Sequence, residues 1–147
     1  MGNSIKLAYS TYALQGIDPL EALQRIRTIG YNAVEIAVGD DWPTAPRKLG
    51  AAARQELRTC VEDLGFPPPA LFGPVPTCAE GPARAGMLEQ YVRILDLADD
   101  LNFGSESAVV TTTVGGRQLD WENDRMRIAD DLVELAELAA EARVILA

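Results

Sequence analysis

The sequence predicts an α/β fold in which four strand-helix units are followed by a fifth strand. Two observations carry this prediction. Short apolar segments rich in β-branched residues begin near residues 5, 33, 70, 108 and 144, and an amphipathic helical segment follows each of the first four. A regular alternation of strand and helix favours parallel strands joined by right-handed crossovers. The 147 residues have the length of one domain, which we assign to residues 1–147.

The first unit is a short strand followed by a helix with clear start and stop signals. Segment 5–14 begins as an apolar strand and then turns polar. Asp18 is followed by proline, with Glu21 three residues after it, which is typical of a helix N-terminus. Gly30 is placed to end this helix in the left-handed conformation.

The second and third units follow the same plan. Segment 31–39 predicts a strand with alternating apolar residues, and segment 50–64 predicts the helix after it. Segment 67–73 predicts a weaker strand, because its prolines lack backbone N–H donors. We therefore expect only residues 70–72 to pair. A helix over 84–101 completes the third unit.

The fourth unit contains the clearest strand and the longest helix. Segment 107–116 is rich in β-branched residues and contains two glycines, and 122–142 predicts a helix. Segment 144–147 predicts the fifth strand. On the long helix we expect Asp130 and Asp131 to belong to a solvated acidic face. We expect its inner face to contain Met126, Ala129, Leu132, Val133, Ala136 and Ala139.

Two architectures fit this order of elements. The first is (β/α)4-β, the N-terminal half of a TIM barrel with parallel strands. Eight units of about 35 residues would reach about 280 residues, within the range of such barrels. The second is a five-stranded doubly wound, flavodoxin-like sheet. A G-x-G-x-x-G motif after the first strand would have favoured the second architecture, and the sequence has none.

The composition excludes several classes of protein. The chain has 22 acidic and 13 basic residues, a net charge of −9, and no basic run, so we expect no nucleic-acid partner. It has no signal peptide and no apolar stretch of about 18 residues, so we expect no membrane partner and a cytoplasmic protein with reduced cysteines. The absence of histidine excludes Ser-His and Cys-His nucleophiles and histidine metal ligands within this chain.

Several stretches carry a resemblance to a known family. They are KLAYSTYAL at 6–14, DPLEALQRIRTIGYNAVEIAVGD at 18–40, and the helix ending CVEDLGF at 60–66. Within the second stretch, GYNAVEI at 30–36 has the order glycine, aromatic, small or polar, any residue, Val, Glu, aliphatic. AVVTTTVGGR at 108–117 ends in a glycine-containing turn. These stretches resemble the N-terminal half of the sugar phosphate isomerase/epimerase family, the xylose-isomerase-like barrels.

The resemblance implies a (β/α)8 barrel with a divalent metal, Mn or Mg, in its mouth. In the family, the metal ligands are carboxylates and a histidine from the fifth to the eighth strands, and the first ligand follows an aliphatic run like VILA at 144–147. None of these ligands maps onto this chain. We therefore expect it to contain no cofactor, no metal ligand and no catalytic residue, and to be inactive alone.

The ends of the first two strands supply three candidate substrate-binding residues, because barrel sites form where strands end. Ser10 and Tyr12 could hydrogen-bond sugar hydroxyls, or they could simply cap the turn. Glu35 alternates with apolar neighbours, so it points to the opposite face of its strand, into the barrel. A carboxylate there needs a polar ligand or an ion-pair partner, and both interpretations stay open.

Later loops supply two more candidates. Trp42 follows Asp40 and Asp41, and its indole could stack on a sugar ring. The two adjacent carboxylates could also be no more than a solvated loop. Arg117 follows the paired glycines at 115–116, which could hold a phosphate with their N–H groups or form an ordinary turn.

These residues support three hypotheses of function. The first is the N-terminal half of a metal-dependent sugar or sugar phosphate isomerase/epimerase-like protein. The second is a non-catalytic assembly domain that pairs through open strand edges, either as a homodimer or with a separate C-terminal half barrel. The third is a small-molecule-binding doubly wound domain. Light scattering distinguishes the third hypothesis from the second, because a clean monomer at high concentration would favour a closed doubly wound sheet.

Overall fold

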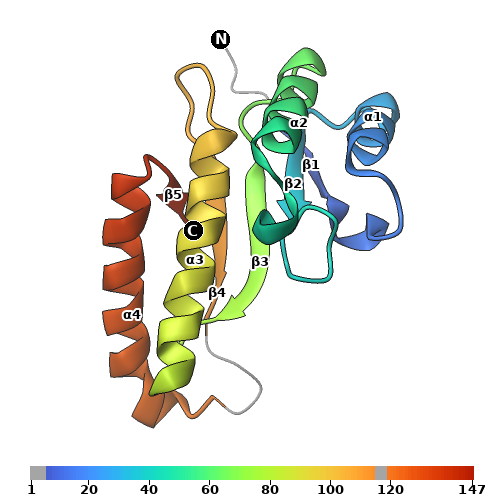
Figure 1. Ribbon diagram of the computed structural model, residues 1–147. Coiled ribbons are helices and arrows are strands. Elements are labelled where there is room, and N and C mark those ends of the chain that lie inside the picture. Colours follow the sequence, from blue (N-terminus) through green and yellow to red (C-terminus); the bar gives the residue numbers. More distant parts are fainter. Residues whose placement is uncertain (1–5, 115–118) are drawn as a thin grey trace.

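The computed structural model describes residues 6–114 and 119–147 (Figure 1). Strands and helices alternate along this part of the chain, as the sequence predicts. Two short 3-10 helices, η1 and η2, are additional. In order, the elements are β1 (Ala8–Ser10), η1 (Thr11–Leu14), α1 (Pro19–Ile29), β2 (Ala33–Ala37), η2 (Pro46–Lys48), α2 (Ala51–Asp63), β3 (Ala70–Pro76), α3 (Pro82–Asp100), β4 (Val109–Thr113), α4 (Trp121–Glu141) and β5 (Ile145–Leu146).

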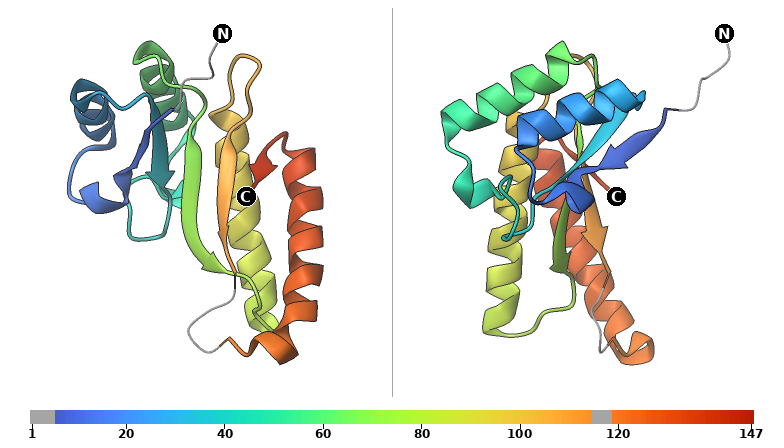
Figure 2. Two further views of the ribbon diagram at one scale, coloured as in Figure 1. Left: turned by 180° about the vertical axis from the view of Figure 1, so that it is seen from behind. Right: turned by 90° about the vertical axis from the view of Figure 1, so that its right-hand side faces the viewer.

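The strands of the described residues form one parallel sheet in the order β1-β2-β3-β4-β5. The helices α1 to α4 cover one face of this sheet and leave the other face open (Figures 1 and 2). A doubly wound sheet has helices on both faces and a reversal in its strand order. The flavodoxin-like alternative is therefore wrong, and the architecture is (β/α)4-β, half of a TIM barrel.

The core lies between the sheet and the helices. Val34 and Ile36 of β2 are buried on this side, together with Leu71 of β3 and Val110 of β4. They pack against buried helical residues such as Leu23 in one continuous cluster. Because alternate side chains of a strand point to opposite faces, the residues between them lie on the open face.

The predicted ends of the first helix are confirmed. The side chain of Asp18 accepts hydrogen bonds from the backbone N–H groups of Leu20 and Glu21, at 3.0 and 3.2 Å. Gly30 ends α1 with φ of 111°, which a residue with a Cβ rarely adopts. Local chemistry therefore defines the crossover from β1 to β2.

Strand β3 is longer than expected, because it continues through its prolines to Pro76. The pairing with β4 shifts register between Phe72 and Pro76. The buried hydroxyl of Tyr91 on α3 donates a hydrogen bond to the carbonyl of Val75 at 2.6 Å in this irregular stretch. Burial raises the pKa of Tyr91 to about 12. A side chain from the helix layer thus supplies a partner where the strand ladder is irregular.

The inner face predicted for α4 is largely wrong. The structure buries Ile128, Leu135 and Ala139, whereas Met126 and Val133 are 68% and 61% exposed. The helix carries two apolar stripes, and only the contact with the sheet and α3 decides which one is buried. Leu132 is half-buried. Ala129 and Ala136, also predicted to face inward, are exposed, while Ala139 is correctly predicted.

Among the helices in residues 6–114 and 119–147, none combines the length and apolar character that a membrane crossing requires.

Candidate functional site

The open face of the sheet carries a row of aligned residues, one from each strand. Ser10 pairs with Glu35, Glu35 with Ala70, Ala70 with Val109, and Val109 with Ile145. In a closed barrel this face would be the interior, which is normally filled by layers of side chains from neighbouring strands. No helix of the described residues covers this face, and Ile145 is 53% exposed.

Glu35 is the acidic member of this row. It is half-buried between Val34 and Ile36, which point into the core, so the alternation expected from the sequence is present. Within the described part of the chain, no hydrogen bond or ion pair occupies its carboxylate. The structural ion pair with an arginine, one of the two interpretations of Glu35, is thus absent from residues 6–114 and 119–147. Within the described residues its carboxylate is therefore not engaged by another side chain.

Ser10 lies next to Glu35 and has a local role. Its side-chain oxygen accepts a hydrogen bond from the N–H of Tyr12 at 3.3 Å, which caps η1. The turn-capping interpretation of Ser10 is therefore correct. The hydroxyl hydrogen can still be donated elsewhere, because the cap uses only the oxygen as an acceptor.

Three aromatic rings meet at the same end of the sheet. The ring of Tyr12 lies 4.9 Å from that of Trp42, tilted by 34°, and 5.8 Å from that of Phe72 at 60°. Tyr12 is 51% exposed, so its ring is accessible. The structure therefore brings together two predicted residues and adds Phe72. Sequence reasoning placed Phe72 in a strand but missed its role, although the alternation in β3 points it to the open face.

Two buried threonines hold this aromatic cluster at the end of β2. The Thr11 hydroxyl accepts a hydrogen bond from the Ala37 N–H at 2.9 Å. The Thr44 hydroxyl donates to the Ala37 carbonyl at 2.5 Å. Thr11 precedes Tyr12, and Thr44 follows Trp42 by two residues. Both loops are consequently tied to one residue of the strand, which limits how far the two rings can move apart.

The loop after β2 also borders a cleft of about 410 Å³ on the side of α3. Asp40 forms an ion pair with Arg47 at 3.2 Å, and Asp41 lies exposed beside it. Among the described residues, no group of three or more cysteine or acidic side chains could hold a metal ion. Both aspartates are exposed, as the solvated-loop interpretation expects. Arg117 and the preceding glycines lie outside the described residues.

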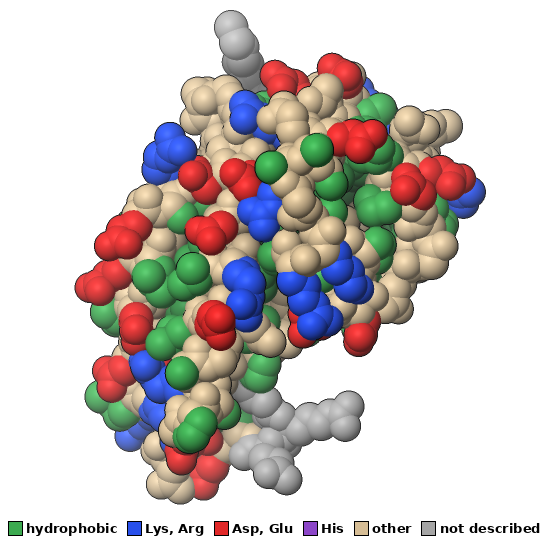
Figure 3. All heavy atoms as spheres, in the orientation of Figure 1, with side chains coloured by type: hydrophobic (Ala, Val, Ile, Leu, Met, Phe, Trp, Pro, Cys, Tyr) green, Lys and Arg blue, Asp and Glu red, His purple; other side chains and the backbone are tan. Residues whose placement is uncertain are grey.

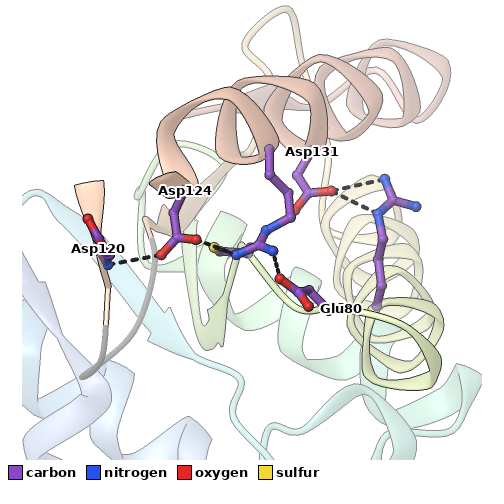
Figure 4. A network of polar contacts seen from close by, with 7 residues as sticks. Glu80, Asp120, Asp124 and Asp131 are labelled. Carbon is purple, nitrogen blue, oxygen red and sulfur yellow. Dashed lines mark hydrogen bonds and ion pairs between the residues drawn. The ribbon is translucent and has the colours of Figure 1, made fainter. Parts of the chain in front are cut away.

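A network of charged residues lies beyond the C-terminal end of β3, between the loop after this strand, α3 and α4 (Figure 4). Its centre is Asp131, which is 1% exposed. The prediction that Asp131 belongs to a solvated acidic face is therefore wrong. It accepts hydrogen bonds from Arg84 at 2.9 Å and from the backbone N–H of Cys78 at 3.1 Å. The hydrogen bond with Glu134 raises the pKa of Arg84 most, and the hydrogen bond with Asp131 raises it further. These contacts join the loop after β3 to α3 and α4.

A second arginine extends the network toward the start of α4. Arg127 donates to the Cys78 sulfur at 2.9 Å and to Asp124 at 2.5 Å, and it pairs with Glu80. Cys78 has a φ of 83°, so its backbone is in the left-handed region. The network ties the loop after β3 to the first half of α4. Nothing in the spacing of these residues along the sequence indicates it.

Comparison with known structures agrees with the architecture. The probable 3-DHS dehydratase AsbF of Bacillus anthracis has a TM-score of 0.73 at 13% identity, over 97% of this chain and 51% of that one. The 3-keto-D-glucoside 4-epimerase YcjR of E. coli has a TM-score of 0.68 at 20% identity, over 97% and 55%. Protein SMc04130 of Sinorhizobium meliloti 1021 has a TM-score of 0.65 at 18% identity, over 96% and 49%.

At these identities the likeness shows the fold alone. No family model matches the chain, and no curated protein matches it in sequence. The chain spans about half the length of the solved structures named above. The class of protein is thus half of a (β/α) barrel.

Proposed function

We propose that this chain is the N-terminal half of a sugar isomerase/epimerase-like barrel and that its open face supplies part of a carbohydrate pocket. The observation that carries the proposal is the cluster of Tyr12, Trp42 and Phe72, together with Glu35 on the open face of β2, whose carboxylate has no hydrogen-bond or ion-pair partner among the described residues. The fold is also that of a known epimerase, YcjR, whose substrate is named as a 3-keto-D-glucoside.

The two parts of the cluster suit the two parts of a sugar. A pyranose has an apolar face of C–H groups, which packs on an aromatic ring, and a rim of hydroxyl groups, which need hydrogen-bond partners. Tyr12 and Trp42 provide the aromatic surface. Glu35 accepts hydrogen bonds from hydroxyls, and the Ser10 hydroxyl can donate one. Such groups favour a neutral sugar over a sugar phosphate, because no basic side chain belongs to the aligned row.

The chain's own residues bind and orient the substrate in this proposal. Isomerases and epimerases of this type transfer a proton next to a carbonyl, and a divalent metal would polarise the substrate oxygens in the complete barrel. The described residues do not form a group that fits such a metal. The ligands of such a metal would come from a second half of the barrel.

A second candidate function is assembly without catalysis. Its specific support is the exposed apolar surface at the edge of the sheet, where Ile145 of β5 is 53% exposed. Open strand edges and exposed apolar patches both favour association. A homodimer or a complex with a C-terminal half barrel would cover this surface.

Binding of sugars can be followed by the fluorescence of Trp42 in a Trp121→Phe background, which leaves one indole. We expect D-glucose, D-xylose or D-fructose to change the emission saturably, with roughly millimolar affinity because only half of the pocket is present. Glu35→Gln should weaken binding several-fold, whereas the matched change Glu62→Gln on the exposed surface of α2 should not. Fructose 6-phosphate tests the phosphate alternative. No saturable response to any of these ligands would overturn the proposal.

A further inference from the structure

Helix α4 presents a second apolar surface in addition to the one it buries. Met126 and Val133 are among the exposed large hydrophobic residues of the molecule, at 68% and 61%. Ala129, Ala136 and Ala140 are exposed as well. Their spacing of three or four residues places all five on one stripe of the helix. We call this set, residues 126, 129, 133, 136 and 140, the α4 flank.

The α4 flank faces away from the neighbouring helix. Asp131 and Glu134 bond to Arg84 of α3, so α3 lies on their side of α4. Successive residues of a helix turn by about 100°, which places Met126 and Val133 on the other side. In Figure 1 and in the left view of Figure 2, α4 stands at the edge of the molecule with α3 beside it.

A row of acidic residues runs beside the flank. Asp130, Glu137 and Glu141 are exposed, and no ion pair involves them within the described part of the chain. No lysine or arginine occurs in α4 after Arg127. The space-filling view shows hydrophobic and acidic side chains together over the middle of α4 (Figure 3). A binding partner of the flank must therefore satisfy both an apolar stripe and a local negative potential.

We infer that the α4 flank is a docking surface for an amphipathic helix whose apolar stripe is bordered by lysine or arginine. This inference rests on the part of the proposed function in which a second half completes the barrel. The similar solved structures are about twice as long as this chain, so the length of chain that would supply further helices is available in a protein of that size. In a closed barrel each helix packs between two neighbours, and among the described residues α4 packs against one helix, α3.

A second copy of α4 does not fit this surface. Packing two flanks together would bring two rows of Asp130, Glu137 and Glu141 into proximity, and like charges across a helix interface oppose association. The charge on the flank therefore selects against self-association through α4. It favours a basic partner helix instead.

The test uses two synthetic helical peptides that carry the same leucine stripe. One has lysines and the other glutamates beside the leucines. Binding of each labelled peptide to the full chain is measured by fluorescence anisotropy. We expect the lysine peptide to bind at least fivefold more tightly than the glutamate peptide, with a preference that weakens as salt rises. The double variant Asp130→Lys and Glu137→Lys should reverse the preference.

Two single variants locate the binding surface. Val133→Glu should reduce binding of the lysine peptide at least tenfold, because it places a charge in the apolar stripe. The matched change Val92→Glu, at an exposed valine of α3, should have little effect. Equal binding of both peptides, no binding of either, or equal effects of the two valine variants would overturn the inference. So would a wild-type dimer that Val133→Glu dissociates.

The peptide and sugar experiments fail independently. Peptide binding at α4 does not involve Trp42, and sugar binding at the open face does not involve Val133. Loss of the sugar response with peptide binding intact would overturn the carbohydrate site alone. The reverse result would overturn only the docking surface.

Discussion

Replacing Asp131 with alanine removes one carboxylate that two donors use. Its oxygens accept hydrogen bonds from Arg84 at 2.9 Å and from the Cys78 N–H at 3.1 Å. The side chain is 1% exposed, so water cannot readily replace these contacts. Arg84 itself is 36% exposed and keeps its contact with Glu134 at 2.5 Å. The substitution therefore breaks only part of the network.

The magnitude follows from these contacts. A buried donor left without an acceptor costs about 1–3 kcal/mol, and removing one partner of a fully buried ion pair costs about 3–5 kcal/mol. The retained Glu134 contact and the partial exposure of Arg84 place Asp131→Ala near the lower range, at about 2–3 kcal/mol. Asp131→Asn keeps an acceptor for the Cys78 N–H and should cost about 1 kcal/mol. Glu134→Ala removes a largely solvated contact and should cost about 0.5 kcal/mol.

Urea unfolding, monitored by far-UV circular dichroism, measures these differences. The free energy of unfolding is extrapolated linearly to zero urea. The loss for Asp131→Ala corresponds to a fall of about 5–10 °C in Tm for a chain of this size. An alanine variant within about 0.5 kcal/mol of wild type would refute the reasoning. A larger cost for Glu134→Ala than for Asp131→Ala would refute it too, because the buried carboxylate would then not be the central acceptor.

Three further predictions concern other parts of the molecule. Burial raises the pKa of Tyr91 in the folded chain to about 12, above its value in the unfolded chain. The free energy of unfolding should therefore fall as pH rises from about 10 to about 12. Tyr91→Phe should remove this loss, as measured by urea titrations at alkaline pH. Gly39→Ala would place a Cβ 2.9 Å from the ring of Trp42, so the ring must move, and the fluorescence response to sugars should decrease. Burial raises the pKa of Cys60 most, and the negative charge of Asp63 raises it further. Alkylation of Cys60 at pH 8 should therefore be slower than that of free cysteine, and Asp63→Asn should make it faster than in the wild type.

Local patterns in the sequence predicted most of the secondary structure. The cap at Asp18 and the left-handed glycine at Gly30 are both present, because each depends on a few neighbouring residues. The alternation that points Glu35 away from the core is present for the same reason. The continuation of β3 to Pro76 was missed, since its irregular pairing with β4 involves Tyr91 from a distant helix.

The candidate site was predicted in part. The rule that barrel sites form where strands end selected Ser10, Tyr12, Glu35 and Trp42. The structure places Ser10 beside Glu35, and it brings the rings of Tyr12 and Trp42 into contact. It could not select Phe72, because the register of β3 against β2 determines which ring meets that of Tyr12. Substrate binding by these residues stays a prediction for the fluorescence experiment.

The sequence by itself determined the order of the elements, their caps and the alternation of the strands, because these follow from contacts within a few residues. Only the tertiary structure decided the sequential order of the strands in one sheet, which excludes the doubly wound fold. It also decided that Asp131 is buried while Met126 on the same helix is exposed. A helix with apolar residues on two sides has no local reason to bury one of them. The choice comes from the sheet, from Arg84 and from the loop at Cys78, which lie far away along the chain.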